Sequence, residues 1–205
     1  MRRTLTALVL AALTGLGLCA EPARLEIVRN RSFDRETCAA ASAEPLRAPL
    51  IAGAPAIDGA LDDAFWRTAF HAKGFCTRAG APATAPTEMW IAHNGDTLFL
   101  AARCRRAAAD ANWAKGEQFT FFVDGNNDGD DCFRVSLRPN GKAQIGFEPA
   151  GSAAVRRLRA TWQTAARLDE LGGEWALEAA APLAQLEAFS GATIRLNAER
   201  SGVSG

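Results

Sequence analysis

One stretch, residues 119–147, constrains the fold of this chain more than any other. Its first run, FTFFV, alternates so that Thr120 and Phe122 share one face of a strand. Its second run, FRVSLR, alternates apolar with polar residues, which predicts a strand with one buried face. The third run, KAQIGF, follows Asn140-Gly141, a dipeptide typical of a tight type I′ hairpin turn. Three such runs predict a β-meander and therefore an all-β domain.

The connection between the first two runs is acidic and longer than a tight turn needs. It has the D-x-N-x-D-G spacing of an oxygen-ligand calcium loop, in which alternate side chains converge on the ion. The twelfth position of that loop is Val135 and not glutamate, so further ligands would have to come from elsewhere. A solvated loop of turn-forming residues is the competing interpretation. The predicted calcium ligands are Asp124, Asn126, Asp128 and Asp130.

Length and charge restrict the function classes. The chain has 205 residues, of which 48% are hydrophobic, which is enough for one domain with a sizeable core. Its 23 basic and 23 acidic residues cancel. This balance gives no electrostatic reason to expect binding to nucleic acid or to an anionic membrane.

The first twenty residues are typical of an export signal. A basic start is followed by an apolar run of secretory length and a small-residue end, which favours cleavage after Ala20. Lipid attachment at Cys19 is the alternative, and it is the weaker one because Leu18 stands where lipoprotein signals have a small residue. We therefore expect a secreted or periplasmic protein.

Export implies an oxidising compartment, which changes what the cysteines indicate. Four cysteines, an even number, remain after the predicted signal, and an oxidising compartment favours one or two disulfides among them. Their spacing leaves all three pairings open. The residues concerned are Cys38, Cys76, Cys104 and Cys132.

The rest of the chain divides into an approach segment and a domain. Residues 21–53 show little periodicity and are predicted to be an extension or linker with one short strand at most. Residues 54–205 are predicted to form the domain. Near its start, a short helical turn capped by Asp62 or Asp63 presents Trp66 as a plug for the core.

Short motifs follow one another in order over about residues 56–200. They are Ile57-Asp58-Gly59, Leu61-Asp62-Asp63 with Trp66, Leu98-Phe99-Leu100-Ala101, FFVDGNNDG, Trp175-x-x-Glu178 with Ala181-Pro182-Leu183, and Asn197-x-x-Arg200. This series resembles the carbohydrate-binding modules of family 9 and their DOMON-like relatives. The resemblance implies an immunoglobulin-like antiparallel β-sandwich that binds sugars and often carries calcium. Family domains usually continue past the last motif, so this chain is expected to lack a terminal strand.

Sugar binding requires exposed aromatic faces edged by planar hydrogen-bonding groups. Trp113, in a polar stretch, is our first prediction for a stacking residue, and Trp90, opposite Met89 and Ile91 on its strand, is the second. A position in the core is the competing interpretation of Trp90. The candidate polar partners are Arg134, Asn197 and Arg200, and the tryptophans assigned to the core are Trp66, Trp162 and Trp175.

Catalysis, haem binding and a purely structural role are the alternatives to sugar binding. The sequence has no recognisable catalytic set, so we predict a non-catalytic domain that binds a neutral oligo- or polysaccharide. DOMON-like relatives bind b-type haem, which here would require Met89 with His71 or a lysine, because His93 lies too close in sequence to clamp the opposite side. A structural module without ligand is the third possibility.

Overall fold

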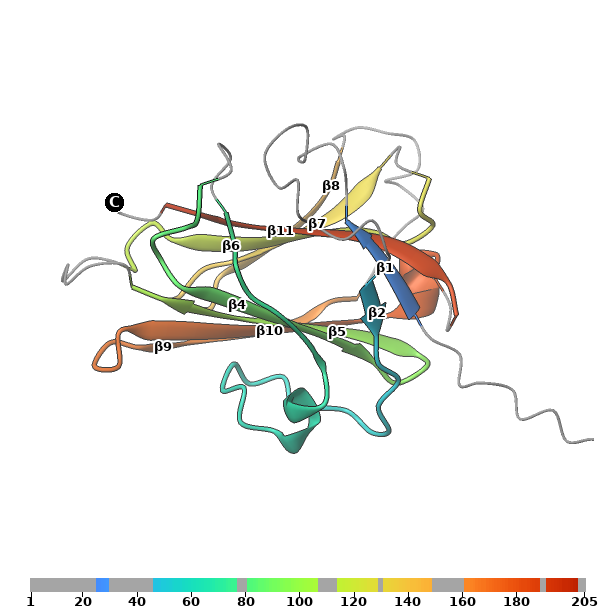
Figure 1. Ribbon diagram of the computed structural model, residues 1–205, viewed down its shortest axis with the longest axis horizontal. Helices are drawn as coiled ribbons and strands as arrows, with labels where there is room; N and C mark the ends of the chain where they lie inside the picture. The colour runs from blue at the N-terminus through green and yellow to red at the C-terminus, as the bar shows by residue number, and fades with distance from the viewer. Residues whose placement is uncertain are drawn as a thin grey trace, which may run out of the picture.

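The computed structural model describes residues 25–29, 46–76, 81–106, 114–128, 131–148, 161–188 and 191–202. Two β-sheets pack face to face, and the only helical elements in these ranges are two 3-10 turns (Figure 1). No helix in the described ranges is long and apolar enough to cross a membrane. The predicted all-β sandwich is confirmed.

The six-stranded sheet contains the meander predicted from the sequence. Three consecutive strands, β6, β7 and β8, pair antiparallel, and β11 pairs antiparallel with β6. In sheet order the strands are β2 (Leu46–Ala48), β1 (Leu25–Arg29), β11 (Thr193–Ser201), β6 (Gln118–Asp124), β7 (Cys132–Leu137) and β8 (Ala143–Glu148).

The five-stranded sheet is antiparallel throughout and contains the predicted hairpin of residues 87–104. Its central strand, β5, pairs with β4 on one side and with β10 on the other. In order the strands are β3 (Phe70–Ala72), β4 (Thr87–His93), β5 (Thr97–Arg105), β10 (Glu174–Pro182) and β9 (Gln163–Asp169).

The core lies between the two sheets and follows the period-two pattern of the strands. Phe119, Phe121 and Val123 of β6 are fully buried, as are Leu100 of β5 and Leu177 of β10. Each strand that contributes to this core turns its alternate residues to an outer face. The two outer faces are therefore the surfaces on which a ligand could lie flat.

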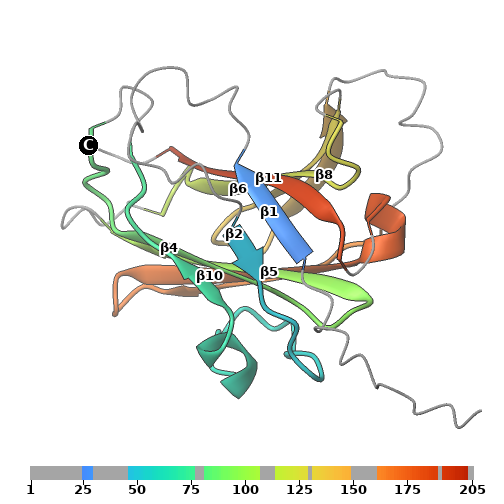
Figure 2. The ribbon, with the colours of Figure 1, turned by 45° about the vertical axis from the view of Figure 1, so that its right-hand side comes forward.

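The segment predicted to be an extension contributes two strands to the sandwich. β1 runs parallel to β11, with Ile27 opposite Ile194, and β2 pairs antiparallel with β1 (Figure 2). The prediction of at most one short strand in residues 21–53 was wrong. A strand that pairs with a neighbour far along the chain leaves no turn signal beside it.

The turn between β7 and β8 differs from the predicted type I′ turn. The Arg138 amide donates to the Lys142 carbonyl (3.0 Å), and the Gly141 amide donates to the Arg138 carbonyl (2.9 Å). Gly141 has a positive φ of 79°, whereas Asn140 is not among the residues with positive φ. This is the pattern of a three-residue hairpin loop, which needs only one residue in the left-handed region.

Residues 50–68, here called the strap, cross the outer face of the five-stranded sheet. In Figure 1 the strap lies below this sheet. Its 3-10 turn η2 (Ala64–Arg67) packs Phe65 edge-on to Phe99, with ring centroids 5.0 Å apart. Trp66 beside it is 4% exposed, as predicted for a plug. Asp63 occupies the N-cap position, but its carboxylate accepts from the Ala56 amide (2.9 Å) and does not cap the turn.

Glu178 of β10 holds the strap to the sheet. Its Oε2 accepts from the amides of Asp58 (2.8 Å) and Gly59 (2.7 Å), and its Oε1 accepts from the indole Nε1 of Trp66 (2.8 Å). The side chain is fully buried, and this burial raises its pKa, which the three hydrogen bonds oppose. The Ile-Asp-Gly motif and the motif glutamate are thus two halves of one contact.

A second buried carboxylate, Glu117, joins the two sheets in what we call the brace. Its Oε1 lies 2.6 Å from Nη2 of Arg200, and its Oε2 accepts from Arg200 Nε (3.2 Å) and from the indole of Trp175 (2.7 Å). Arg200 also donates to Thr87 Oγ1 (3.1 Å). The brace therefore connects β11 of one sheet with β4 and β10 of the other.

Candidate functional site

A row of four residues crosses the outer face of the six-stranded sheet. Asn197 of β11 lies opposite Phe122 of β6, Phe122 lies opposite Arg134 of β7, and Arg134 lies opposite Gly146 of β8. Phe122 points outward because its neighbours on the strand, Phe121 and Val123, face the core, and its ring is partly exposed. The structure thus brings two predicted ligand residues, Arg134 and Asn197, to either side of one aromatic ring.

Local geometry positions the polar groups of this row. A Cβ at Gly146 would lie 3.5 Å from Nη2 and 3.6 Å from Nε of Arg134, which is ordinary van der Waals contact, so the guanidinium lies over the neighbouring strand β8. On the other side of the ring, Oδ1 of Asn197 accepts from the Ala198 amide (2.8 Å), which orients the side-chain amide. A planar cation and a planar amide therefore flank Phe122.

The flanking rows of this face are also polar. Thr120 and Ser136 are opposite each other and share a hydrogen bond of 2.9 Å between their hydroxyls. Toward the acidic loop, Arg195 lies opposite Asp124 and donates from Nε to Oδ1 of Asn127 (2.7 Å). Phe122 is thus a partly exposed aromatic side chain between polar rows, in which Thr120, Ser136 and Asp124 are themselves buried. Phe122 was missed as a site residue, although the alternation of FTFFV had placed it on the face opposite Phe119 and Phe121.

Trp90 lies on the other outer face of the molecule, that of the five-stranded sheet. His71 of β3 stacks on it with ring centroids 4.5 Å apart and an angle of 9° between planes, and Arg103 of β5 lies 5.5 Å from its centroid. Among the tryptophans that the structure describes, Trp90 is partly exposed. The others are buried as predicted, namely Trp66, Trp162 and Trp175. Trp113 lies outside the described residues and stays a prediction.

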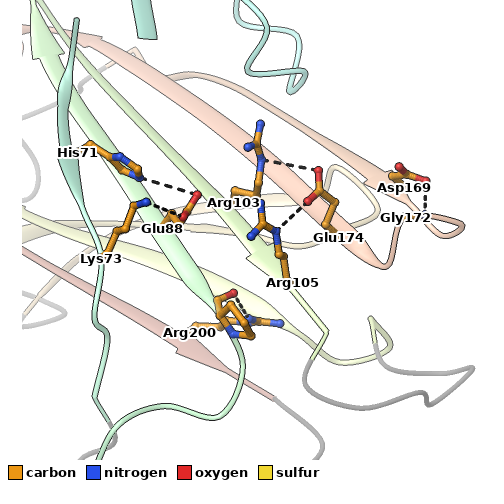
Figure 3. A network of polar contacts seen from close by, with 10 residues as sticks. His71, Lys73, Glu88, Arg103, Arg105, Asp169, Gly172, Glu174 and Arg200 are labelled. Carbon is orange, nitrogen blue, oxygen red and sulfur yellow. Dashed lines mark hydrogen bonds and ion pairs between the residues drawn. The ribbon is translucent and has the colours of Figure 1, made fainter. Parts of the chain in front are cut away.

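A network of charged side chains lies on this face of the five-stranded sheet (Figure 3). Glu88 lies 3.8 Å from His71 and 3.4 Å from Lys73, and Glu174 is shared between two arginines, Arg103 at 3.7 Å and Arg105 at 3.2 Å. Partial burial lowers the pKa of His71, an effect that Glu88 offsets in part. Each charged group of this network therefore lies near a group of opposite charge, and the side chains are partly exposed to solvent.

Arg200 was predicted to contact a ligand, and its position does not support that role. Its side chain is 4% exposed and points between the sheets, because β11 turns Ile194, Leu196, Ala198 and Arg200 inward. Its guanidinium already bonds Glu117 and Thr87 in the brace. The sequence pattern could not reveal this, since an arginine at a strand end is usually solvated.

The acidic loop is closed by its own side chains. Asp124 is 4% exposed and accepts from the Asn127 amide (2.7 Å), while Nδ2 of Asn126 donates to Asp128 (2.8 Å) and to Glu187 (3.1 Å). The amide nitrogen of Asn126 thus lies between two carboxylates. In the described ranges no three acidic, histidine or cysteine side chains gather as a metal cluster. Asp130 lies outside these ranges, and calcium binding stays a prediction.

The predicted disulfide is not found among the described cysteines, since Cys76, Cys104 and Cys132 are all thiols. Strand register explains this: Cys104 lies opposite Thr87 and Trp175, and Cys132 lies opposite residue 148. Burial raises the pKa of Cys104 to about 12, which keeps its thiol protonated. Cys38 lies outside the described residues.

The haem alternative required Met89 with His71 or a lysine to bind one iron from opposite sides, and the geometry of the first pair can be described. Met89 is 8% exposed and faces the core, opposite Ala72, whereas His71 lies opposite Trp90 on the outer face. The two side chains therefore project from opposite faces of one sheet and cannot clamp a single macrocycle. His93 is fully buried, and burial lowers its pKa.

Together the fold and the outer faces define a β-sandwich with one partly exposed aromatic ring between polar side chains on the outer face of its six-stranded sheet. No protein-family model and no curated protein matches the sequence. Solved structures similar to the chain include a family 9 carbohydrate binding module from Caldicellulosiruptor kristjanssonii in complex with cellotriose (17% identity, TM-score 0.46) and one in complex with glucose (15%, 0.47). A putative carbohydrate-binding protein from Bacteroides uniformis ATCC 8492 is also similar (15%, 0.43).

These likenesses cover part of each molecule. The cellotriose complex matches over 65% of this chain and 66% of that one, which is just under two thirds of its length. The glucose complex matches over 65% and 67%, and the Bacteroides protein over 68% and 73%.

Proposed function

We propose that this chain is an exported, non-catalytic domain that binds a neutral oligo- or polysaccharide on the outer face of its six-stranded sheet. The observation that supports this most is the row in which Arg134 and Asn197 flank the partly exposed ring of Phe122. Arg134 and Asn197 were predicted from the sequence as polar partners of a sugar, and they lie on either side of Phe122, which was not among the predicted site residues.

The chemistry of a sugar fits this arrangement. A pyranose offers an apolar C–H face to the ring of Phe122 and a rim of hydroxyls to its neighbours. The guanidinium of Arg134 can only donate, whereas the amide of Asn197 both donates and accepts, so the two sides of the ring suit hydroxyls in different roles. Because the surface is flat and encloses little of a ligand, the binding is expected to be weak.

Affinity electrophoresis against a panel of soluble neutral glucans, xylans and mannans would test the proposal, followed by calorimetry on any glycan that retards the protein. Phe122→Ala is expected to abolish retardation, since loss of a central aromatic contact costs on the order of 2 kcal/mol or more. Arg134→Met is expected to weaken it while the melting temperature changes little.

Trp90→Ala is the matched control, because Trp90 is the partly exposed aromatic of the opposite face. Retardation unchanged by Phe122→Ala but lost with Trp90→Ala would place the site on the five-stranded sheet. Loss with Trp113→Ala alone would place it in residues outside the described ranges. No retardation by any glycan of the panel would refute saccharide binding of this class.

Export is proposed from residues 1–20 alone, which lie outside the described ranges. Its measurement is independent of binding. N-terminal sequencing of the exported protein is expected to begin at Glu21, and a lipid-modified Cys19 would establish the alternative.

A further inference from the structure

β8 is the longer exposed edge of the six-stranded sheet. Within the described residues it pairs with β7 only and ends the sheet order, and it has six residues. The other edges are less available: β2 and β3 have three residues each, and Gly59 of the strap packs against the backbone of β9. Exposed edges of this length can template pairing with another strand.

The side chains of β8 on the core side are only partly covered, although Phe147 packs edge-on against Phe133. Ile145 lies opposite Val135, which is fully buried, yet Ile145 itself is 46% exposed. Ala143 on the same face is exposed, and Phe147 is partly exposed. β8 thus extends beyond the cover of the five-stranded sheet and presents an apolar face to solvent next to its open edge.

Hydrogen-bond parity determines which backbone groups point to the open edge. The Arg138 amide donates to the Lys142 carbonyl, so these two residues form a hydrogen-bonded pair of the hairpin. Hydrogen-bonded pairs alternate in an antiparallel ladder, which assigns the backbone groups of residues 144 and 146 to β7. The amides and carbonyls of residues 143, 145 and 147 therefore face away from β7.

We propose that β8 pairs antiparallel with β8 of a second copy of this chain, about a two-fold axis at Ile145. In this register Ile145 lies opposite Ile145 of the second copy, and Ala143 lies opposite its Phe147. The outward backbone groups of all three residues then meet their counterparts in about six hydrogen bonds. The partly covered apolar side chains meet on one face of a sheet that continues through both copies.

The sequence of β8 is complementary to itself in this register. Position 142 is a lysine and position 148 a glutamate, and the two lie at equal distances from Ile145. A two-fold axis there sets each opposite the other, so opposite charges oppose one another at both ends. Such an isologous contact closes at a dimer and leaves no edge for a third copy. Because it involves one strand from each copy, the dimer is expected to be weak and concentration-dependent.

Sedimentation equilibrium over a range of protein concentrations would test this, with proline variants that separate the two edges of β8. Ile145→Pro removes an amide that faces the open edge, where proline is tolerated, and is expected to weaken the dimer roughly tenfold or more without melting the fold. Gln144→Pro removes an amide of the β7 ladder and is expected to lower the melting temperature. A strictly monomeric parent, or a dimer unaffected by Ile145→Pro, would overturn the proposal.

Cross-linking gives a test that does not depend on proline being accommodated. In a Cys76→Ser background, Ile145→Cys is expected to oxidise to a covalent dimer, because opposed residues of a hydrogen-bonded pair have Cα atoms about 5.5 Å apart. Gln144→Cys, which lies opposite residue 146 and not itself, is expected to stay monomeric on a non-reducing gel. Equal cross-linking of both variants, or of neither, would contradict the register.

Charge reversal then tests the ends of the strand. Lys142→Glu is expected to weaken dimerisation, and the swap Lys142→Glu with Glu148→Lys is expected to restore it. Failure of the swap to restore the dimer would exclude the self-complementary register.

Discussion

The strap and the brace use the same chemistry in different electrostatic surroundings. In each, a buried glutamate accepts from a tryptophan indole, Glu178 from Trp66 and Glu117 from Trp175. In the brace the carboxylate also contacts a guanidinium, whereas in the strap the three donors that contact Glu178 are uncharged N–H groups. Burial accordingly raises the pKa of Glu178. Hydrogen-bond geometry alone therefore does not set the strength of a buried carboxylate contact, because the charge of the donors matters as well.

The largest effect is expected from Glu117→Ala. It leaves the buried guanidinium of Arg200 without its counter-charge and the Trp175 indole without its acceptor, and should reduce the free energy of unfolding by about 3–5 kcal/mol. Urea denaturation is the measurement. The double variant Glu117→Met with Arg200→Met removes both charges and is expected to recover part of this loss. A double variant less stable than the single one would show that the charge pair is not the main term.

A smaller effect is expected from Glu178→Gln, because no charged donor is left behind. The glutamine amide must face either the Trp66 indole or the two strap amides, which sets donor against donor and should cost about 1–3 kcal/mol. Glu174→Gln is the control, since it removes a partly exposed ion-pair partner, for which about 0–1 kcal/mol is expected. Equal losses would mean that the strap contact contributes no more than a surface ion pair.

The acidic loop offers a contrast to the buried glutamates of the strap and the brace. The carboxylates of Asp128 in the loop and of Glu187 beside it are exposed. If calcium binds there, a tenfold excess over its Kd should stabilise the fold on the order of 1 kcal/mol, seen as a higher melting temperature. Asp124→Asn with Asp128→Asn is expected to erase the difference. A melting curve that a chelator leaves unchanged would identify the loop as a turn only.

The smallest effect is expected from pH. Because burial raises the pKa of Glu178 from its ordinary value of 4.5, the folded chain holds this proton more tightly than the unfolded chain. The stability that Glu178 contributes is then fully present below the unfolded pKa and decreases as the pH rises through the folded pKa. The stability difference between parent and Glu178→Gln should therefore shrink as the pH rises above 4.5. A difference that grows over this range would contradict the assignment.

The sequence predicted those parts of the fold that depend on local pattern. The alternation in residues 119–147 and the hairpin at 87–104 correspond to β6, β7, β8, β4 and β5. The burial of Trp66 was also predicted, although Trp66 lies in a separate cluster under the strap and not between the sheets. Period two also assigned Phe122 to the outer face. The sequence pattern could not show that Arg134 and Asn197 flank the ring of Phe122. That arrangement depends on the register of β11 and β7 against β6, which no local pattern determines.

The remaining differences between the sequence predictions and the structure have the same physical origin. β1 pairs in parallel with a strand that lies more than half the chain away, so nothing beside it in the sequence announces the partner. Arg200 has a residue type that is usually solvated, and its burial is compensated by the carboxylate of Glu117 and the hydroxyl of Thr87. Export favoured disulfides among cysteines whose register sets each opposite another residue type. An even number of cysteines after an export signal indicates an oxidising compartment, but it does not determine which cysteines pair in a disulfide.

The contact between Glu178 and the strap also bears on the order in which the chain acquires its structure. The three hydrogen bonds join residues that are 120, 119 and 112 positions apart. A chain that emerges from its N-terminus carries Phe65 and Trp66 long before their anchor exists, and closing so long a loop is slow. We therefore expect the strap to dock after β10 has paired with β5. Until then its two aromatic rings stay open to chaperones and to aggregation.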